Sequence, residues 1–207
     1  MLLEAQSLLN FIAVPIVKIP EGDWLFFYSK SGVKHFLAQL KDKTSISSYK
    51  IACFGPSTGK YWKRNFGQNA HFVGDGKPEH VPTEFKKALA QSDTVVFIKA
   101  KHSKMSVQRV IESEFNCVDV IAYENTIRTN AIQITTPDIA MLTSPLNADA
   151  FIDAVLDYKG LIITLGSTTS SHLKKQYNMD SIPSELITEQ GMLDKLVQIL
   201  GHNERLI

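Results

Sequence analysis

The chain has 207 residues, of which 44% are hydrophobic and 21% are charged, a composition typical of a folded protein with a packed core. Its 22 basic and 21 acidic residues leave a formal net charge of +1, which argues against bulk electrostatic binding of nucleic acid and requires any anion site to be local. Two cysteines and six scattered histidines indicate neither a disulfide framework nor a metal site. The start, interrupted by Glu4, Gln6 and Pro15, reads as neither a signal peptide nor a membrane span, so we expect a reduced, cytoplasmic protein.

Short apolar runs alternate with helical patterns along the chain, which predicts βαβ units and parallel sheets. The expected strands are mostly continuous in apolar character, as strands buried on both faces are: 11–17, 24–28, 50–54, 94–98, 118–123, 139–143 and 161–165. The expected amphipathic helices are 32–40, 60–66, 82–90, 106–115, 148–158 and 170–177, and a last helix over 190–200 ends at Gly201. Residues 45–49, 74–81 and 125–137 are expected as loops, the last of them as a hinge.

An internal repeat is the most informative feature of the sequence. Residues 23–36 read DWLFFYSKSGVKHF and residues 138–151 read DIAMLTSPLNADAF. In both copies an aspartate precedes an apolar strand, a serine follows six positions later, and a phenylalanine follows after seven more. Each copy leads to a second strand that ends in a Gly-x-[Ser/Thr]-Thr loop, at 55–58 and at 166–169. Four features in the same order predict an internal duplication and two similar α/β lobes.

Both of these loops fall at carboxyl ends of predicted strands, where open parallel α/β sheets bind ligands. The glycine permits a tight turn, the hydroxyls can cap the following helix, and free N–H groups at its start can hold an anion. Ser29 and Ser144 occupy the equivalent place after the preceding strands. A single loop of this kind is more often structural. Two related loops indicate surfaces that present hydroxyls and N–H groups to one extended, oxygen-rich ligand.

Catalytic groups are harder to identify. No Ser–His–Asp spacing, Walker loop or Gly-x-Gly-x-x-Gly motif appears, which argues against hydrolase, kinase and dehydrogenase chemistry. Tyr123 ends a predicted strand where a polar connection begins. It is either an ordinary packing residue or, where it faces a ligand, a donor of a hydrogen bond or proton. Basic side chains near strand ends or the hinge are either solvated or, as a set, carboxylate ligands: Lys30, Lys60, Lys99, Lys101 and Arg128.

The combination of motifs resembles the uroporphyrinogen-III synthase family. The matching pieces are 23–36, 51–58, 120–126, 138–151 and 162–169; they occur in the family's order and cover nearly the whole chain from about residue 11. The resemblance implies two parallel-sheet α/β lobes joined by a two-strand linker. On that pattern, residues 1–18 and 126–207 form one discontinuous domain, residues 22–119 form the other, and residues 19–21 and 120–125 are the linker strands.

The resemblance implies an enzyme that converts hydroxymethylbilane, a linear tetrapyrrole polycarboxylate, to uroporphyrinogen III in haem biosynthesis. Water is lost and ring D is inverted through a spiro intermediate, and no metal or organic cofactor is implied. Tyr123 matches the family's linker tyrosine, the candidate proton donor to the leaving hydroxyl. The implied substrate-binding residues are Ser29, Lys30, Gly55, Ser57, Thr58, Thr143, Ser144, Gly166, Ser167, Thr168 and Thr169.

One part of the family pattern has no match. Members usually begin with a strand that ends in Thr-Arg or Ser-Arg, whereas residues 1–10 here read as the end of the following helix. A start further upstream, a rearranged lobe or a loss of activity would each explain this. The alternative function is therefore a non-catalytic, two-lobed protein that binds an anion or a tetrapyrrole. A flavodoxin-like regulatory module would need an acidic pocket, which is not found. Because no heptad pattern occurs, we expect a monomer.

Overall fold

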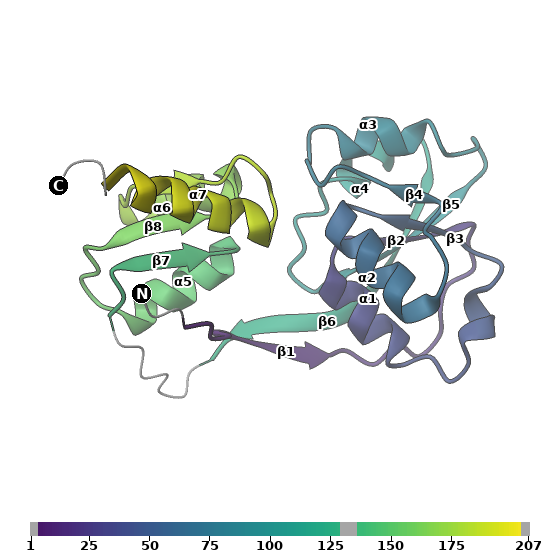
Figure 1. The fold of residues 1–207 in the computed structure, drawn as a ribbon. Helices are drawn as coiled ribbons and strands as arrows, with labels where there is room; N and C mark the ends of the chain where they lie inside the picture. The colour runs from purple at the N-terminus through teal and green to yellow at the C-terminus, as the bar shows by residue number, and fades with distance from the viewer. Residues whose placement is uncertain (1–3, 129–135, 204–207) are drawn as a thin grey trace. The chain divides into compact units, whose positions relative to one another are not determined.

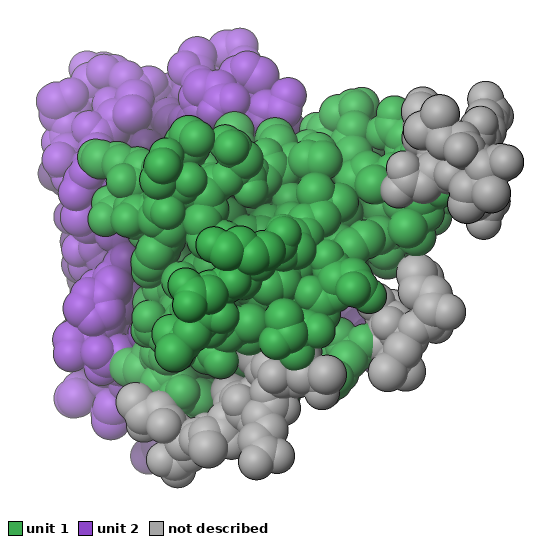
Figure 2. All heavy atoms as spheres, turned by 90° about the vertical axis from the view of Figure 1, so that its left-hand side faces the viewer, with its two compact units in different colours: residues 1–10, 126–207 green, residues 11–125 purple. Residues whose placement is uncertain are grey.

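The computed structural model describes residues 4–128 and 136–203. The chain forms two compact units: unit 1 comprises Met1–Asn10 and Thr126–Ile207, and unit 2 comprises Phe11–Asn125 (Figure 2). Residues 11–18, expected in the discontinuous domain, group with unit 2. The reason is that β1 (Leu9–Ala13) lies beside β6 (Asn116–Ile127) in the sheet, and Val14 N–H donates to Ala122 O at 3.1 Å just after it.

Unit 2 is built on a sheet with the strand order β1-β6-β5-β2-β3-β4 (Figure 1). Its strands β2 (Trp24–Phe27), β3 (Lys50–Cys53), β4 (Phe72–Val73), β5 (Thr94–Ala100) and β6 run parallel to one another. The helices are α1 (Lys30–Leu37), α2 (Pro56–Phe66), α3 (Val81–Lys86) and α4 (Gln108–Ile111), with a short 3-10 helix at Lys43–Ile46. In register, Phe27 lies opposite both Cys53 and Ile98, so these strands reach the same edge of the sheet together.

Side chains alternate between two apolar layers in unit 2. Leu25 and Phe27 point into one layer with Phe36 of α1 and Trp62 of α2. The intervening strand residues pack into the other layer with side chains of α3 and α4, among them Phe85. Each such buried side chain contributes about 1.5–3 kcal/mol. Helices on both faces explain why the strands read as continuous apolar runs.

Unit 1 contains a smaller parallel sheet in the order β7-β8-β9 (Figure 1). The strands are β7 (Ile139–Leu142), β8 (Leu161–Thr164) and β9 (Ile182–Pro183), and the helices are α5 (Pro145–Ala154), α6 (Ser167–Tyr177) and α7 (Glu189–Asn203). One face of the sheet packs with α5 and α6 around Phe151 and Leu173, and the other packs with α7 around Met192 and Leu196. This two-sided burial again needs apolar strands.

The expected α/β class with parallel sheets is confirmed, and each predicted strand and helix has a counterpart with shifted ends. Three expectations were wrong. The last helix continues past Gly201 to Asn203, because one glycine costs a helix only about 1 kcal/mol and Ile199 and Leu200 pack just before it. Residues 1–10 were expected to form the last part of a helix. Residues 4–8 form no helix and lead directly into β1, with Leu8 buried. The segment 45–49, expected as a loop, overlaps the 3-10 helix. Asp42 caps the start of this helix, because its side chain accepts a hydrogen bond from Thr44 N–H.

Two further differences concern short or uncertain segments. Strands β4 and β9 were not predicted, because two residues are too few to show a period. The expected hinge at 125–137 begins later than predicted, since β6 runs to Ile127, and residues 129–135 lie outside the described part of the chain. None of the helices in the described residues has the length and apolar character needed to cross a membrane.

Candidate functional site

Each unit carries a serine that caps the helix after its first repeat strand. Ser29 has extended backbone angles (φ −154°, ψ 161°), and its Oγ accepts a hydrogen bond from Gly32 N–H at 3.0 Å at the start of α1. Ser144 has nearly the same angles (φ −159°, ψ 160°), and its Oγ accepts from Asn147 N–H at 3.2 Å at the start of α5. Both hydroxyls thus satisfy a helix donor that would otherwise lack a partner.

The second loop of each repeat begins a helix with a glycine. Gly55 precedes α2 and Gly166 precedes α6, and neither helix has a side-chain cap. In α2, Pro56 has no N–H and Thr58 N–H donates to Gly55 O, which leaves Ser57 N–H for water or a ligand, and the first turn of α6 offers such N–H groups as well. The third residue after each glycine, Thr58 or Thr169, is buried. The exposed hydroxyls of the two loops are Ser57, Ser167 and Thr168. A ligand at these helix starts can therefore reach N–H groups and exposed hydroxyls within each unit.

Tyr123 comes from β6 and packs in the core of unit 2, with only 7% of its surface exposed. Its hydroxyl lies 3.0 Å from Ser29 Oγ. His35 of α1 stacks on its ring, with 5.3 Å between ring centroids and 19° between planes. Burial raises the pKa of Tyr123, whereas hydrogen bonds with Ser29 and Ser31 oppose this shift. The phenol therefore keeps its proton near neutral pH. The ring of Tyr123 packs in the core, which is the first of the two roles considered from the sequence. Its hydroxyl lies beside Ser29, the residue that precedes α1.

The expected set of carboxylate-binding cations is only partly available. Lys99 is 5% exposed, and its Nζ contacts Asp119 Oδ2 at 2.5 Å and Met105 Sδ at 2.8 Å. A buried ammonium group needs such a partner, so Lys99 is bound across the β5–β6 pair and is not a free ligand for substrate. Two further cations have protein partners: Lys101 Nζ lies 3.1 Å from Glu124 Oε1, and Arg128 Nη1 donates to the Ser7 carbonyl oxygen.

The remaining predicted residues lie where strands end. Lys30 is exposed at the first position of α1, and Lys60 is exposed on α2. In unit 1, Thr143 is exposed between β7 and Ser144, and Leu165 N–H donates to Leu142 O at 3.0 Å, which places the start of the 166–169 loop beside the end of β7. The structure thus brings Ser29 and Tyr123 together in unit 2, and it brings Ser144 and its neighbouring loop to one sheet edge in unit 1.

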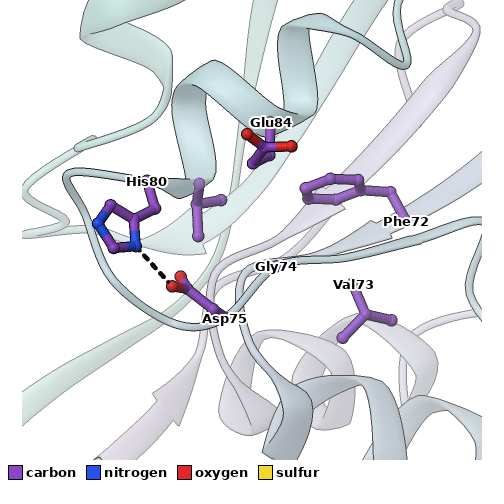
Figure 3. A pocket seen from close by; sticks show the side chains of 7 residues that line it. Phe72, Val73, Gly74, Asp75, His80 and Glu84 are labelled. Carbon is purple, nitrogen blue, oxygen red and sulfur yellow. Dashed lines mark hydrogen bonds and ion pairs between the residues drawn. The ribbon is translucent and has the colours of Figure 1, made fainter.

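A hollow of about 380 Å³ beside the end of β4 was not predicted (Figure 3). Its lining residues come from β4, the following loop and α3: Phe72, Val73, Gly74, Asp75, His80, Val81 and Glu84. Asp75 Oδ2 accepts from His80 Nδ1 at 2.8 Å, and Figure 3 shows the imidazole turned toward this carboxylate. The pKa of Asp75 is lowered by the Lys77 N–H bond and by His80. The sequence predicted only a loop over residues 74–81 at this place.

A comparison with models of known protein families identifies the family of this chain. A family model described as uroporphyrinogen-III synthase HemD matches residues 7–194. The chain belongs to the uroporphyrinogen-III synthase family. The fold and the enzyme class expected from the resemblance, a cyclising lyase of tetrapyrrole biosynthesis, are thereby confirmed. The non-catalytic alternative receives no support.

Solved structures share the fold at low sequence identity. Uroporphyrinogen-III synthetase from Helicobacter pylori superposes with a TM-score of 0.70 and 20% identity, over 93% of this chain and 91% of that one. A mutant uroporphyrinogen III synthase from Thermus thermophilus gives a TM-score of 0.60 and 11% identity, over 94% and 88% of the two chains. No curated protein sequence matches closely enough to add to these comparisons.

Proposed function

We propose that this chain converts hydroxymethylbilane to uroporphyrinogen III, with loss of water and inversion of ring D, and that it does so as a cytoplasmic monomer without a metal or organic cofactor. The observation that carries this proposal is the family match over residues 7–194. The position of Tyr123 at the N-terminus of α1, inside unit 2, supplies the candidate acid.

The chemistry needs one proton donor. The lone pair of a pyrrole nitrogen in the substrate expels the hydroxyl group, and Tyr123 Oη–H protonates it so that water leaves. The substituted carbon of ring D then attacks, the spiro intermediate fragments, and the ring closes with the other orientation. The proton released when the last pyrrole regains aromaticity returns to the Tyr123 phenolate, so the cycle balances. A phenol whose pKa is raised by burial holds its proton until the leaving group takes it.

Substrate carboxylates are held by local groups, since the net charge of +1 provides no general field. Ser57 N–H at the start of α2 and the N–H groups at the start of α6 are donors, and the exposed hydroxyls of Ser57, Ser167 and Thr168 extend them. In unit 1, Thr143 and Ser144 add hydroxyl groups at the same edge of the sheet, where β7 ends. In unit 2, Lys30 adds a cation. Thr58 and Thr169, both buried, shape their loops from beneath. The work of the protein is to hold one folded conformer of the substrate.

A coupled assay tests the proposal. Hydroxymethylbilane is generated in situ, the protein is added, the products are oxidised, and type I and type III uroporphyrin are separated by chromatography. We expect a type III excess over the protein-free control, because unaided cyclisation gives type I. Only type I product from a sample with folded circular dichroism would contradict the proposal.

A further inference from the structure

The hydroxyl of Ser29 already has two partners inside unit 2. Its oxygen accepts from Gly32 N–H at 3.0 Å and lies 3.0 Å from Tyr123 Oη. A serine hydroxyl has one proton and two lone pairs. The capping bond occupies one lone pair, and the tyrosine contact occupies either the proton or the other lone pair. Little capacity remains for a substrate atom, which is the role that the family resemblance implies for this residue.

We infer that Ser29 is a positioning residue for Tyr123: its hydroxyl donates to Tyr123 Oη and leaves the tyrosine proton directed to the departing hydroxyl of the substrate. This inference rests on the proposed function. Proton transfer turns Tyr123 into a phenolate, which then accepts the Ser29 hydrogen bond as a charged acceptor, and bonds of this kind are about twice as strong as neutral ones. Ser29 thereby stabilises a charge that exists only after the transfer begins.

Helix α1 supports this role electrostatically. It is eight residues long, and Ser29 is bonded to one of its first-turn N–H groups. The partial positive charge at a helix N-terminus favours a nearby anion, and the chain Gly32 N–H, Ser29 Oγ–H, Tyr123 Oη aligns this dipole with the phenolate. Burial raises the pKa of Tyr123, and its hydrogen bonds with Ser29 and Ser31 act against this rise.

Packing within unit 2 holds the contact between Ser29 and Tyr123 in place. Ser29 and Tyr123 lie 94 positions apart in sequence, yet both belong to unit 2, so their contact is a property of one compact unit. His35 stacks on the tyrosine ring and Phe11 lies 6.0 Å from it between centroids. These contacts restrict the ring so that its hydroxyl stays at Ser29.

A double-mutant cycle tests the inference. Turnover to type III product and KM are measured for the wild type, Ser29→Ala, Tyr123→Phe and the double variant. We expect Ser29→Ala to lower kcat tenfold or more with KM within twofold, and we expect no further loss when it is added to Tyr123→Phe. Ser29→Thr, which keeps a capping hydroxyl, restores most of the turnover. Tyrosine ¹³C NMR titration shows a higher Tyr123 pKa in Ser29→Ala.

Two variants separate positioning from helix capping. Ser29→Asp keeps a capping oxygen but has no proton to donate at neutral pH, so it retains the unfolding free energy while kcat falls at least as far as in Ser29→Ala. Thr188→Ala removes a comparable cap, because Thr188 Oγ1 accepts from Gly191 N–H at 3.0 Å at the start of α7. It loses a similar unfolding free energy and keeps its turnover.

Several outcomes would overturn the inference, and they differ from failure of the proposed function. An equal fold loss from Ser29→Ala in both backgrounds shows that Ser29 acts independently of Tyr123. A raised KM with unchanged kcat makes Ser29 a substrate contact. Wild-type turnover in Tyr123→Phe removes the tyrosine itself from the mechanism. Absence of type III product from the wild-type chain would instead contradict the proposed function.

Discussion

The two repeat copies fold into the same βαβαβ module, one in each unit. β2-α1-β3-α2-β4 in unit 2 corresponds to β7-α5-β8-α6-β9 in unit 1. The carbonyl of Asp23 accepts from Lys50 N–H at 2.8 Å, and the carbonyl of Asp138 accepts from Leu161 N–H at 3.0 Å. Both aspartates thus mark where their strand pairs begin. A duplication predicts this agreement, and duplication itself remains our prediction.

The second helix of each module agrees in even more detail. α2 and α6 are each 11 residues long, follow a glycine, and end at a residue in the left-handed conformation: Gly67 with φ 86° and Asn178 with φ 53°. Trp62 and Leu173, both buried, occupy the same position seven residues after the glycine. The module therefore fixes the loops and helix starts, while the size of the core residue differs.

The two units differ outside the shared module. In unit 2 the sheet continues through β5 to β6, which brings Tyr123 to the capping serine. In unit 1, α5 and α6 are joined by polar contacts in addition to their apolar packing: Asp149 Oδ1 accepts from His172 Nε2 at 2.5 Å and from Tyr177 Oη at 2.8 Å. Burial, followed by the bond to Asp149, raises the pKa of Tyr177 to about 12. The shared module thus forms matching loops in both units, and the added strands of unit 2 bring Tyr123, our proposed proton donor, to Ser29.

The largest expected effect distinguishes the tyrosines of the two units. Tyr123→Phe is expected to lower turnover by about 100-fold or more, because the proton donor is lost, with a small change in unfolding free energy. Tyr158→Phe is the matched control. Tyr158 is also buried, but its hydroxyl donates to Leu161 O at 3.0 Å, so its variant keeps its turnover and loses only stability. Equal losses of kcat in the two variants would contradict the assignment.

The loop glycines give the next largest contrast. A Cβ on Gly55 would lie 3.1 Å from the backbone of Gly76, whereas a Cβ on Gly166 would lie 3.6 Å from the side chain of Ile187. Both glycines have extended backbone angles that alanine adopts. Gly55→Ala is therefore expected to lower the free energy of unfolding by about 1–3 kcal/mol, and Gly166→Ala by less than about 0.5 kcal/mol. Urea unfolding measures both, and equal values would show that the two loops are equivalent.

A smaller difference is expected between the two tryptophans of unit 2. Trp24 Nε1 donates to Asp93 Oδ2 at 2.8 Å, whereas Trp62 Nε1 is buried without a partner among the described residues. Trp24→Phe leaves a buried carboxylate with one donor fewer, at a cost of about 1.5–3 kcal/mol. Trp62→Phe loses no hydrogen bond, so its cost should be at least about 1 kcal/mol lower. If Trp62→Phe is the more damaging variant in urea unfolding, the position needs more than an apolar side chain.

The smallest effect concerns pH. Burial, and then neighbouring Lys34, lowers the pKa of His35, so the unfolded chain binds this proton more readily than the folded chain. The free energy of unfolding should therefore fall as pH drops through about 6.5. His35→Ala introduces alanine, which is the residue at the equivalent repeat position in unit 1, Ala150. This variant should flatten the dependence of the unfolding free energy on pH between pH 7 and pH 5. An unchanged slope in thermal unfolding would exclude His35 as a source of the acid sensitivity.

Much of the fold followed from local patterns. Apolar runs indicated the longer strands, and the repeat placed Ser29 and Ser144 at matching helix starts, because capping depends on residues three apart. Pairing between distant segments was not readable. The ion-pair partner of Lys99, Asp119, comes from the neighbouring strand β6. The hollow at His80 depends on how β4 and α3 pack.

The sequence by itself determined the α/β class, the order of elements, the two related loops and the residues that resemble the uroporphyrinogen-III synthase family, because each of these is written in periodicity and short motifs. Only the tertiary structure decided that the Tyr123 hydroxyl meets Ser29, that Thr58 lies buried while Ser57 is exposed, and that Lys99 is bound to Asp119. The physical reason is that strand order and helix packing set distances between residues far apart in the chain, and those distances decide which polar groups are left free for a substrate.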